Sequence, residues 1–455
     1  MAIIASAVER IKSDPLSFLG GAEGVNQCFA DVGHVWRSRV LDPANTLALF
    51  IVQVLHCNTA ISHLRHLSPL KFAESSYSDA RARLPLAGVA AAVGKLCGEG
   101  GKCIEDAASW LGRRVLMTDA TTAAAPDTPA LQACWPQPAA QKPGCGFPIV
   151  KVLALVDLAT GLILQLTMMA LATHEASQLA GPHGALRAGD VLLGDRAFCS
   201  FAHLAMLVSA SVDAVFRMHQ RQVVDFTPGR AHRKKSKKKY KRGVPTSHFV
   251  RRLGAEDQIV EWVKPENQPA WMTDAQFAAL PATLQVRELR YRITAKGMRT
   301  RVVTIATTLL DPMRYPKREI AKLYGLRWEI ETNFGHLKTT MRMEHLKCQT
   351  VDGVMKELMV FALVYNLVRG VMAMAAARQG IADANRMSFI DALRWLCALL
   401  SEKPSGVEPP ELIVNPRRPG RSCPRVIKRR RKEYDLMNKP RAEYAEPSEA
   451  EEVTA

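Results

Sequence analysis

The sequence predicts an α/β fold in which helices cover a sheet that is buried on both faces. Three observations lead to this fold class: apolar runs of strand length between residues 110 and 212, helical spacing on either side of them, and short strand-like runs farther along the chain. Strands covered on both faces are apolar throughout and need helices above and below them. At 455 residues, the chain has room for about two to four structural units.

The first region, residues 1–109, is expected to be helical. Apolar positions recur at helical spacing in TLALFIVQVLHCNTAISHLRHL and in SDARARLPLAGVAAAVGKL. Basic residues such as Arg65, Arg81 and Arg83 suit a helical module that contacts DNA. An ordinary amphipathic helix pair has the same pattern, so the two interpretations stay open at this point.

The next region, residues 110–212, is expected to form the first part of the sheet. Its strand-like runs are RRVLMTDA, FPIVKVLALVD, GLILQLTMMAL and DVLLGDRAF. Asp119 and Asp195 are both expected where a strand ends, and side chains there project into the cleft in which open α/β sheets bind ligands. Each has a structural alternative, since Asp119 could cap the following turn and Asp195 could pair with Arg196.

Residues 213–316 are expected to form an inserted, β-rich subdomain. Short strand-like runs (HFVRRL, QIVEWV, LQVRELRYRI and RVVTIATTL) alternate with loops rich in proline, glycine and charge. A basic run from Arg230 to Arg242, RAHRKKSKKKYKR, cannot belong to a packed core. It predicts a solvated loop whose charge favours contact with phosphates. The cations at its centre are Lys234, Lys235, Lys237, Lys238 and Lys239.

Helical periodicity returns in residues 317–377 and continues into residues 378–455. The apolar stretch from Met359 to Ala376 is interrupted by Asn366 and Arg369, which predicts a buried helix and no membrane span. After the helical run MSFIDALRWLCALL comes the tail NPRRPGRSCPRVIKRRRKEY, which is too basic to fold alone. We expect this tail to lie along DNA or a partner chain.

The charge balance favours a polyanionic partner. Lys and Arg number 61 against 43 Asp and Glu, which gives a net charge of +18. Cations that neutralise phosphates release condensed counterions, so nucleic acid is the leading candidate. The ten cysteines contain no C-x2-C pair, and the amino terminus lacks a long apolar core. These features predict a protein of the reducing cytosol without a zinc site, signal peptide or membrane anchor.

The sharpest motif is Tyr324-x2-Arg327-x3-Glu331-x6-Lys338. At about 100° per residue, these offsets return to nearly the same side of a helix, so one polar stripe is predicted. It offers one hard oxygen ligand, flanked by a phenol and two cations that can bind phosphates. The structural alternative is a solvated helix face on which Arg327 and Glu331 form an i,i+4 ion pair.

The three carboxylates Asp119, Asp195 and Glu331 together predict a metal site. Mg²⁺ prefers carboxylate, water and phosphate oxygens, and two-metal phosphodiester chemistry needs several carboxylates from different elements. Two strand ends and one downstream helix supply that set. Mn²⁺ is expected to substitute for Mg²⁺ because it accepts the same oxygen ligands.

These residues resemble the signature of a known family. The order of Asp119, Asp195 and the Y-x2-R-x3-E-x6-K motif is similar to that of the bacterial insertion-sequence transposases named for YREK, the hairpin-forming cut-and-paste group called the IS-four family. Further segments that carry the resemblance are SSYSDARARLP, ETNFGHLKTTMRMEHLKC, SFIDALRWL and RPGR-x3-R-x2-KRR.

The resemblance implies an RNase H-like catalytic domain that is split along the chain. Its first part is residues 110–212 and its second part, with the YREK helix, is residues 317–377. The β-rich insertion of residues 213–316 lies between them. The helical region of residues 1–109, which would bind DNA, and the helical, basic region of residues 378–455 flank the domain.

The resemblance also implies roles for individual residues. Asp119, Asp195 and Glu331 would hold two Mg²⁺ ions that serve a nick, hairpin formation, hairpin opening and strand transfer. Further contacts to phosphates would come from Tyr324, Arg327, Lys338 and Arg217. Hairpin formation requires a flipped base, and aromatic side chains commonly receive such bases. Trp262 and Trp271 are candidates for this role, although a tryptophan in that region is also expected as a core anchor.

The implied protein is a bacterial, cytoplasmic, nucleoid-associated transposase. Its partners would be double-stranded DNA, as transposon ends and target, and a second copy of the chain in the synaptic complex, with no membrane. Two alternatives remain: a catalytically inactive DNA-binding relative, and a nuclease on the RNase H fold. The presence of all signature residues argues against the first, and the basic tail and long insertion argue against the second.

Overall fold

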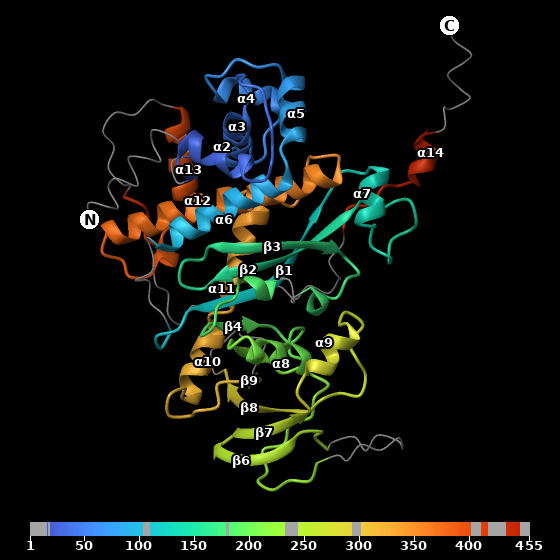
Figure 1. Ribbon diagram of the computed structural model, residues 1–455, viewed down its shortest axis with the longest axis vertical. Helices are drawn as coiled ribbons and strands as arrows, with labels where there is room; N and C mark the ends of the chain where they lie inside the picture. Colours follow the sequence, from blue (N-terminus) through green and yellow to red (C-terminus); the bar gives the residue numbers. More distant parts are fainter. Residues whose placement is uncertain are drawn as a thin grey trace.

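The computed structural model describes residues 16, 19–102, 110–178, 182–232, 244–293, 302–401, 411–416 and 434–445. The described strands form one sheet of nine, in the order β3-β2-β1-β4-β5-β9-β8-β7-β6 (Figure 1). Helices pack against this sheet, so the predicted α/β class is confirmed at that level. The strands are β1 Val115–Ala124, β2 Ile149–Asp157, β3 Ile163–Ala170, β4 Val191–Gly194, β5 Asp213–Arg217, β6 His248–Gly254, β7 Asp257–Val263, β8 Thr283–Arg292 and β9 Val302–Thr307.

The centre of the sheet is parallel and both flanks are antiparallel. Strand β4 pairs in parallel with β1 on one side and with β5 on the other. Strands β2 and β3 continue from β1 in antiparallel pairing. The apolar runs predicted as strands between residues 110 and 212 are therefore strands of one sheet.

The strands of residues 213–316 continue the same sheet. Strand β9 pairs with β5, and β8, β7 and β6 follow outward, each antiparallel to its neighbour. Strand β5 begins at Asp213 and belongs with the parallel centre, although the sequence division assigned residue 213 to the insertion. Pairing between strands far apart in sequence depends on long-range contacts, which local periodicity does not report.

The described helices surround the two faces and one end of the sheet. They are α2 Gly21–Ala30, α3 Pro43–Leu55, α4 Ile61–Leu67, α5 Glu74–Arg83, α6 Leu86–Lys102, α7 Pro129–Cys134, α8 Phe201–Ser209, α9 Asp274–Ala279, α10 Lys317–Gly325, α11 Trp328–Gly335, α12 Val351–Arg378, α13 Phe389–Ser401 and α14 Arg441–Ala445. Short 3₁₀ turns are Glu175–Ser177, Pro182–Ala185 and Ala384–Arg386, and His336–Thr340 is a π-helix.

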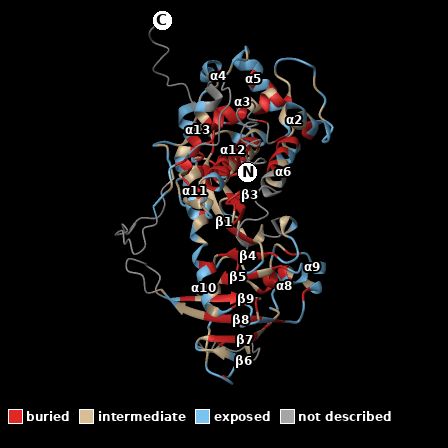
Figure 2. Ribbon diagram, turned by 90° about the vertical axis from the view of Figure 1, so that its left-hand side faces the viewer, coloured by how far each residue is buried: buried red, intermediate tan, exposed pale blue. Residues whose placement is uncertain are grey.

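Two apolar layers cover the two faces of the sheet. Residues of one side of β2, such as Val152 and Ala154, join the core that contains α12, whereas Leu153 on the other side joins the core of α8. This alternation follows from the two-residue period of a strand. Figure 2 shows buried residues along the strands and exposed ones over α4 and α5.

Helix α12 is the central helix of the larger core. By length and composition alone it could cross a membrane, but 83% of its most apolar window is buried inside the protein. Asn366 and Arg369 are buried with it and donate hydrogen bonds to the carbonyls of Ile163 and Thr160, respectively. The sequence prediction of a buried helix at this place is confirmed.

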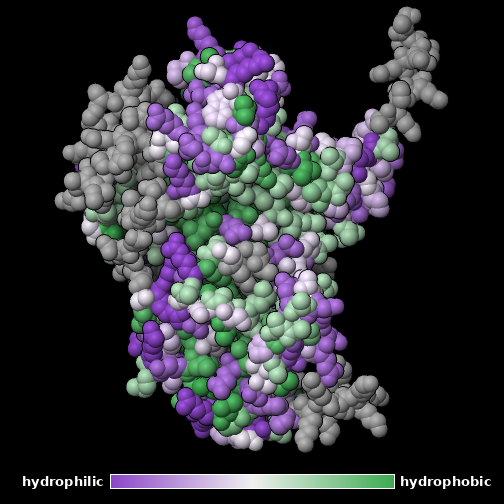
Figure 3. Space-filling view, in the orientation of Figure 1, coloured by the Kyte–Doolittle hydropathy of each residue, from purple (hydrophilic) through white to green (hydrophobic). Residues whose placement is uncertain are grey.

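The N-terminal helices α2–α6 occupy the end of the molecule beyond β3 (Figure 1). Hydrophilic side chains are dense over the α4 and α5 end (Figure 3). Arg81 is half-buried, donates to the Gln53 side chain at 3.1 Å, and lies over the Phe50 ring. Arg65 pairs with Glu74 at 3.3 Å. Arg81 therefore has the role of an ordinary amphipathic helix residue, which was one of the two interpretations open from the sequence.

The last described segment, residues 434–445, packs on the loop between β1 and β2. Met437 donates its backbone N–H to Cys145, and the Arg441 side chain donates to Asp127 at 2.8 Å and to the Gly146 carbonyl at 2.6 Å. The Tyr434 hydroxyl reaches Thr122 on β1 at 3.5 Å. The end of the predicted basic tail is thus held within the same chain, and residues 417–433 lie outside the described residues.

Candidate active site

Asp119 and Asp195 lie side by side on the two central parallel strands. The pairing of β1 with β4 ends at Met117 and Leu193, and each aspartate lies two residues beyond its end. Because side chains alternate along a strand, both aspartates point to the face of the α12 core, as Met117 and Leu193 do. Strand β1 itself continues to Ala124, so Asp119 is not at its end as predicted; the β1–β4 ladder ends there instead.

The predicted single helix of the YREK motif is broken into three pieces. Helix α10 ends at Gly325, α11 begins at Trp328, and the π-helix follows at His336. At the break, the Arg327 N–H donates to Tyr324 with the tighter i to i+3 pattern. The four motif residues therefore do not form one continuous stripe, because the 3₁₀-type turn at Leu326 and Arg327 and the π-helix change the angular step between them.

Arg327 joins two of the predicted carboxylates. Its guanidinium is 2.9 Å from Asp119 and 3.1 Å from Glu331. The i,i+4 pair expected from the structural alternative exists, but the same guanidinium also reaches across to β1. The motif is therefore directed at the sheet, and it does not form a solvated helix face alone.

The surroundings of Asp119 disfavour the ionised form of its carboxyl group. Burial raises its pKa from 3.8 to about 6, although the Ala120 backbone N–H and Arg327 lower it, and the charge of Asp195 raises it further. Oxygen donors of this kind are those that a divalent cation prefers, and a cation would favour the ionised form of both aspartates. Among the described residues, no three His, Cys, Asp or Glu side chains already converge on a metal position. Asp119, Asp195 and Glu331 fit a divalent cation in donor type, and Arg327 supplies the positive charge between two of them.

Asp195 and Asp119 also make the local contacts expected of turn residues. Asp195 accepts a hydrogen bond from the Ala197 N–H at 2.6 Å, and Asp119 accepts one from the Ala120 N–H at 2.8 Å. Arg196 donates to Gln220 at 2.8 Å, so it does not take the pairing with Asp195 that the sequence left open.

A phenol and an arginine lie beside the aspartates. Tyr324 is buried, and burial raises its pKa, while Arg327 and Arg217 lower it and Asp195 raises it. Arg217 on β5 also lowers the pKa of Tyr291 on β8, which burial raises to about 12. Tyr291 is not among the residues predicted from the sequence. The available signal was its position in the strand-like run LQVRELRYRI, which determines the face of the strand on which its side chain lies.

Lys338 stands on the π-helix. Its ammonium lies 3.9 Å from Glu344, a carboxylate outside the predicted set. The five predicted lysines of the basic run, residues 234, 235 and 237–239, lie outside the described residues.

The two predicted tryptophans belong to the core around α8. Trp262 is 6% exposed and donates its indole N–H to Glu288 at 3.1 Å. It also lines a cavity of about 340 Å³. Trp271 stacks on His203 with ring centroids 4.8 Å apart. These surroundings favour the core-anchor alternative for both residues.

A third tryptophan is exposed beside the carboxylates. Trp328 is 42% exposed, and the Arg327 guanidinium lies 5.5 Å from its ring centroid. The sequence analysis passed over this residue, although it directly follows the motif arginine.

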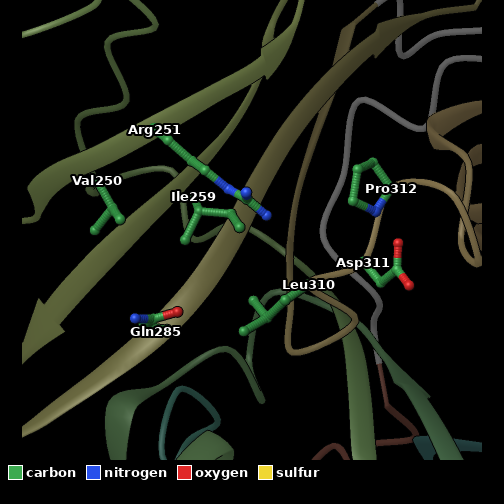
Figure 4. Close-up of a pocket in the computed structure, with 7 residues that line it drawn as sticks. All are labelled: Val250, Arg251, Ile259, Gln285, Leu310, Asp311 and Pro312. Carbon is green, nitrogen blue, oxygen red and sulfur yellow. The ribbon is translucent and has the colours of Figure 1, made fainter.

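A separate hollow of about 440 Å³ lies at the far end of the sheet, where Arg251 reaches across from β6 (Figure 4). It is lined by Val250, Arg251, Ile259, Gln285, Leu310, Asp311 and Pro312. Its strands β6 to β8 are separated from β4 by β5 and β9, so the hollow is remote from the aspartates.

The pKa of Asp119 predicts a pH-dependent stability. Since the folded-state value of about 6 is above 3.8, ionisation of Asp119 destabilises the metal-free protein as pH rises through that window. A shift of about two units corresponds to roughly 3 kcal/mol. We expect Asp119→Asn to raise the Tm of the metal-free protein at pH 7.5 and to leave it unchanged at pH 3.5. A Tm difference that does not vary with pH would contradict this assignment.

Comparisons with known proteins identify the family to which the chain belongs. The family model described as "Transposase DDE domain" matches residues 110–367. The transposase InsG for insertion sequence element IS4 of Escherichia coli (strain K12) is 26% identical over 350 residues, which cover 72% of this chain and 71% of InsG. The cryo-electron microscopy structure of the piggyBac transposase synaptic complex with hairpin DNA gives a TM-score of 0.42 at 11% identity, over 83% of this chain and 76% of that chain. Because the family model covers more than half of the 455 residues, the chain belongs to the transposase DDE domain family, and it is a metal-dependent DNA transposase of the IS4 type.

Proposed function

We propose that the protein excises and inserts an insertion sequence by cut-and-paste transposition, with Asp119, Asp195 and Glu331 as its metal ligands. The observation that carries this proposal is the in-register placement of the two aspartates beyond the β1–β4 ladder, with Arg327 linking Asp119 to Glu331. Two Mg²⁺ ions, when bound there, would activate water or a 3′-hydroxyl and stabilise the leaving oxygen, and Mn²⁺ would serve in their place.

The other residues of the site act on the DNA strand. Arg327, which pairs with Asp119, and Arg217, whose charge acts on Tyr324, hold the phosphate at the scissile bond. Tyr324 keeps its proton, since burial raises its pKa, and donates its O–H to a phosphate oxygen. Lys338 contacts a neighbouring phosphate as a point charge, in place of its present contact with Glu344.

Trp328 is the aromatic residue that suits a base flipped out during hairpin formation. Its ring is exposed next to Arg327, and stacking of a base on an aromatic ring is worth about 1–3 kcal/mol. Trp262 and Trp271 make their contacts within the core around α8, and their role is to stabilise that core.

The catalytic domain is RNase H-like and is assembled from residues 110–212 and 317–377. The order β3-β2-β1-β4-β5, with β1, β4 and β5 parallel, supports this assignment. After β5, which completes the parallel centre, the rest of residues 213–316 extends the sheet as the insertion. Residues 1–109 form the helical DNA-binding region, and residues 378–455 form the C-terminal region. Two copies of the chain hold two transposon ends in the synaptic complex. They act at the nucleoid in the bacterial cytoplasm.

A strand-transfer assay with labelled transposon ends and Mg²⁺ tests this function. Cleaved ends, hairpins and joined products together are the expected result. Binding to ends without any cleavage would identify an inactive DNA-binding relative, and cleavage without joining would identify a nuclease. Either of these results would overturn the proposal.

The basic run of Arg230–Arg242 and the tail of Arg417–Arg441 contribute sequence-independent phosphate contacts, except for Arg230, which is buried against Ser247, and Arg441, which pairs with Asp127. Each contact that is lost flattens the dependence of log affinity on log salt by roughly 0.9. Replacing the lysines of residues 234, 235 and 237–239 by glutamine is expected to lower affinity for end and random duplexes alike and to reduce this slope. An unchanged slope would mean that the run only solubilises the loop.

A further inference from the structure

The segment that follows the π-helix, residues 341–348, alternates between buried and exposed side chains. Its apolar residues are packed into the core: Met341, Met343, Leu346 and Cys348. The side chains between them point outward, and they are mostly basic or imidazole groups: Arg342, Glu344, His345 and Lys347. The orientation of such a segment is fixed, because rotating it would expose the buried apolar side chains and bury the polar ones.

The backbone of this segment is fixed at two places. Glu344 and Leu346 form backbone hydrogen bonds of 2.8 and 2.9 Å with Ala124, the last residue of β1. Farther along, the buried carboxylate of Glu357 on α12 accepts the backbone N–H groups of Lys347 and Cys348 at 2.9 and 2.8 Å. Exposed side chains on such a backbone are held at set positions.

Arg342 has an unfavourable backbone conformation within this segment. Its φ is 62°, in the left-handed region, which costs an L-residue other than glycine roughly 1–2 kcal/mol. The side chain is exposed, and its guanidinium has no hydrogen bond or ion pair with any residue that the structure describes. His345 and Lys347 likewise extend outward from the anchored backbone. Strain of this kind persists where the surroundings over-determine it, and it is frequent at binding sites.

The segment lies in line with the candidate active site. Ala124 is five residues beyond Asp119 on β1, which is about 17 Å at about 3.3 Å per residue. In the DNA-free protein, the ion pair between Lys338 and Glu344 links the segment to the π-helix. One DNA strand carries a phosphate about every 3.4 Å of the helix axis, so this distance corresponds to about five phosphates.

We propose that Arg342, His345 and Lys347 form a phosphate-binding strip for duplex DNA about five nucleotides to one side of the cleaved bond. This inference rests on the proposed function, because the active site defines where the duplex lies. The side chains of Arg342, His345 and Lys347 are exposed along an anchored backbone, which suits contact with a polyanion. Histidine contributes a ring N–H that can donate a hydrogen bond to a phosphate oxygen.

The test uses glycine, which removes the Arg342 side chain and also relieves the backbone. Arg342→Gly is expected to raise or keep the Tm and to lower DNA affinity, with the salt slope flatter by roughly 0.9. Ser211→Gly is the matched control, since Ser211 is exposed with φ 58° at the turn after α8. It should change the Tm in the same direction and leave the slope as in the wild type. Lys347→Gln added to Arg342→Gly should flatten the slope by about another 0.9.

The duplexes used in the binding measurement locate the strip. Transposon-end and random duplexes are each shortened in turn from both sides of the cleavage position. The loss caused by Arg342→Gly should vanish once fewer than about five base pairs remain on one side, and remain when the other side is shortened. A loss of affinity for end DNA alone means that the strip binds the transposon end. A loss of affinity for both kinds of duplex means that the strip binds any duplex. Each of these two results supports it.

If the wild type cleaves ends but the double variant has the same salt slope as the wild type, the strip is overturned and the proposed function stays intact. If the wild type never cleaves ends but the variants have a flatter salt slope, the proposed function is overturned and a DNA contact at this segment is supported. A loss that is the same on all shortened duplexes contradicts the stated distance and overturns the proposal.

Discussion

Replacing any one of the three predicted metal ligands by its amide is expected to reduce strand cleavage by at least about 10³-fold, equivalent to about 4 kcal/mol of transition-state stabilisation. The variants are Asp119→Asn, Asp195→Asn and Glu331→Gln. An amide keeps the size and one hydrogen-bond acceptor of the carboxylate, but it removes the charge that holds a divalent cation. Affinity for transposon-end DNA should stay close to that of the wild type, because the duplex backbone is held by cationic residues.

The measurement is single-turnover nicking of a labelled end, beside a filter-binding measurement on the same DNA. Asp213→Asn is a suitable control, since Asp213 accepts from Arg113 at the opposite end of β5. It removes a carboxylate of the same sheet without approaching the site. Cleavage that survives in one of the three amide variants would remove that residue from the metal site. Activity of the wild type after exhaustive chelation would contradict the two-metal scheme, and recovery with Mn²⁺ is expected.

Arg327→Ala is expected to lower cleavage by about 100-fold, or roughly 3 kcal/mol, with a much smaller effect on thermal stability. The guanidinium donates through one amino group to Asp119 and through the other to Glu331, and so fixes both carboxylates. Arg327→Lys keeps the charge but cannot bridge two carboxylates with a fork, so it should recover only part of the rate. Lys338→Ala should lower the rate less, because its ammonium now lies against Glu344.

The matched control for Arg327 is Arg114→Ala. Arg114 makes a two-pronged pair with Asp190 just before β1 and β4 begin, at the opposite end of these strands from Asp119 and Asp195. Its loss should lower the Tm and leave the cleavage rate of the folded protein unchanged. A fall in Tm for Arg327→Ala that matches its loss of activity would return the motif to the role of a helix-face ion pair.

Much of the secondary structure follows from local patterns in the chain. The apolar runs around Met117 and Leu193 are strands because each is short, branched or aliphatic, and bounded by turn residues. The helix from Val351 to Arg378 was recognisable from its apolar periodicity, and its burial followed from the polar residues that interrupt it. Local patterns of this kind report which face of an element is buried, and they are blind to its distant neighbours.

The features that were missed depend on such neighbours. The pairing of β5 with β9 joins residues about 90 apart in sequence, and no periodicity records it. The break at Gly325 and the π-helix change the rotation between motif residues, and the stack of His336 on Phe389 contributes to the packing there. Side-chain spacing in a motif nominates candidate residues, whereas the geometry of the motif depends on how the surrounding helices pack.

The continuous sheet has a mechanical consequence. From β4, which precedes Asp195, to the edge strand β6 there are five strand steps, each about 4.8 Å wide, so the two are separated by about 24 Å. Hydrogen bonds cross every one of these steps, and no linker between two domains interrupts them. The sheet therefore keeps the distance between the carboxylates and the edge strand β6, which carries Arg251 and Arg252, nearly constant. A duplex that contacts both the carboxylates and this edge must therefore extend over about seven base pairs, at about 3.4 Å per base pair.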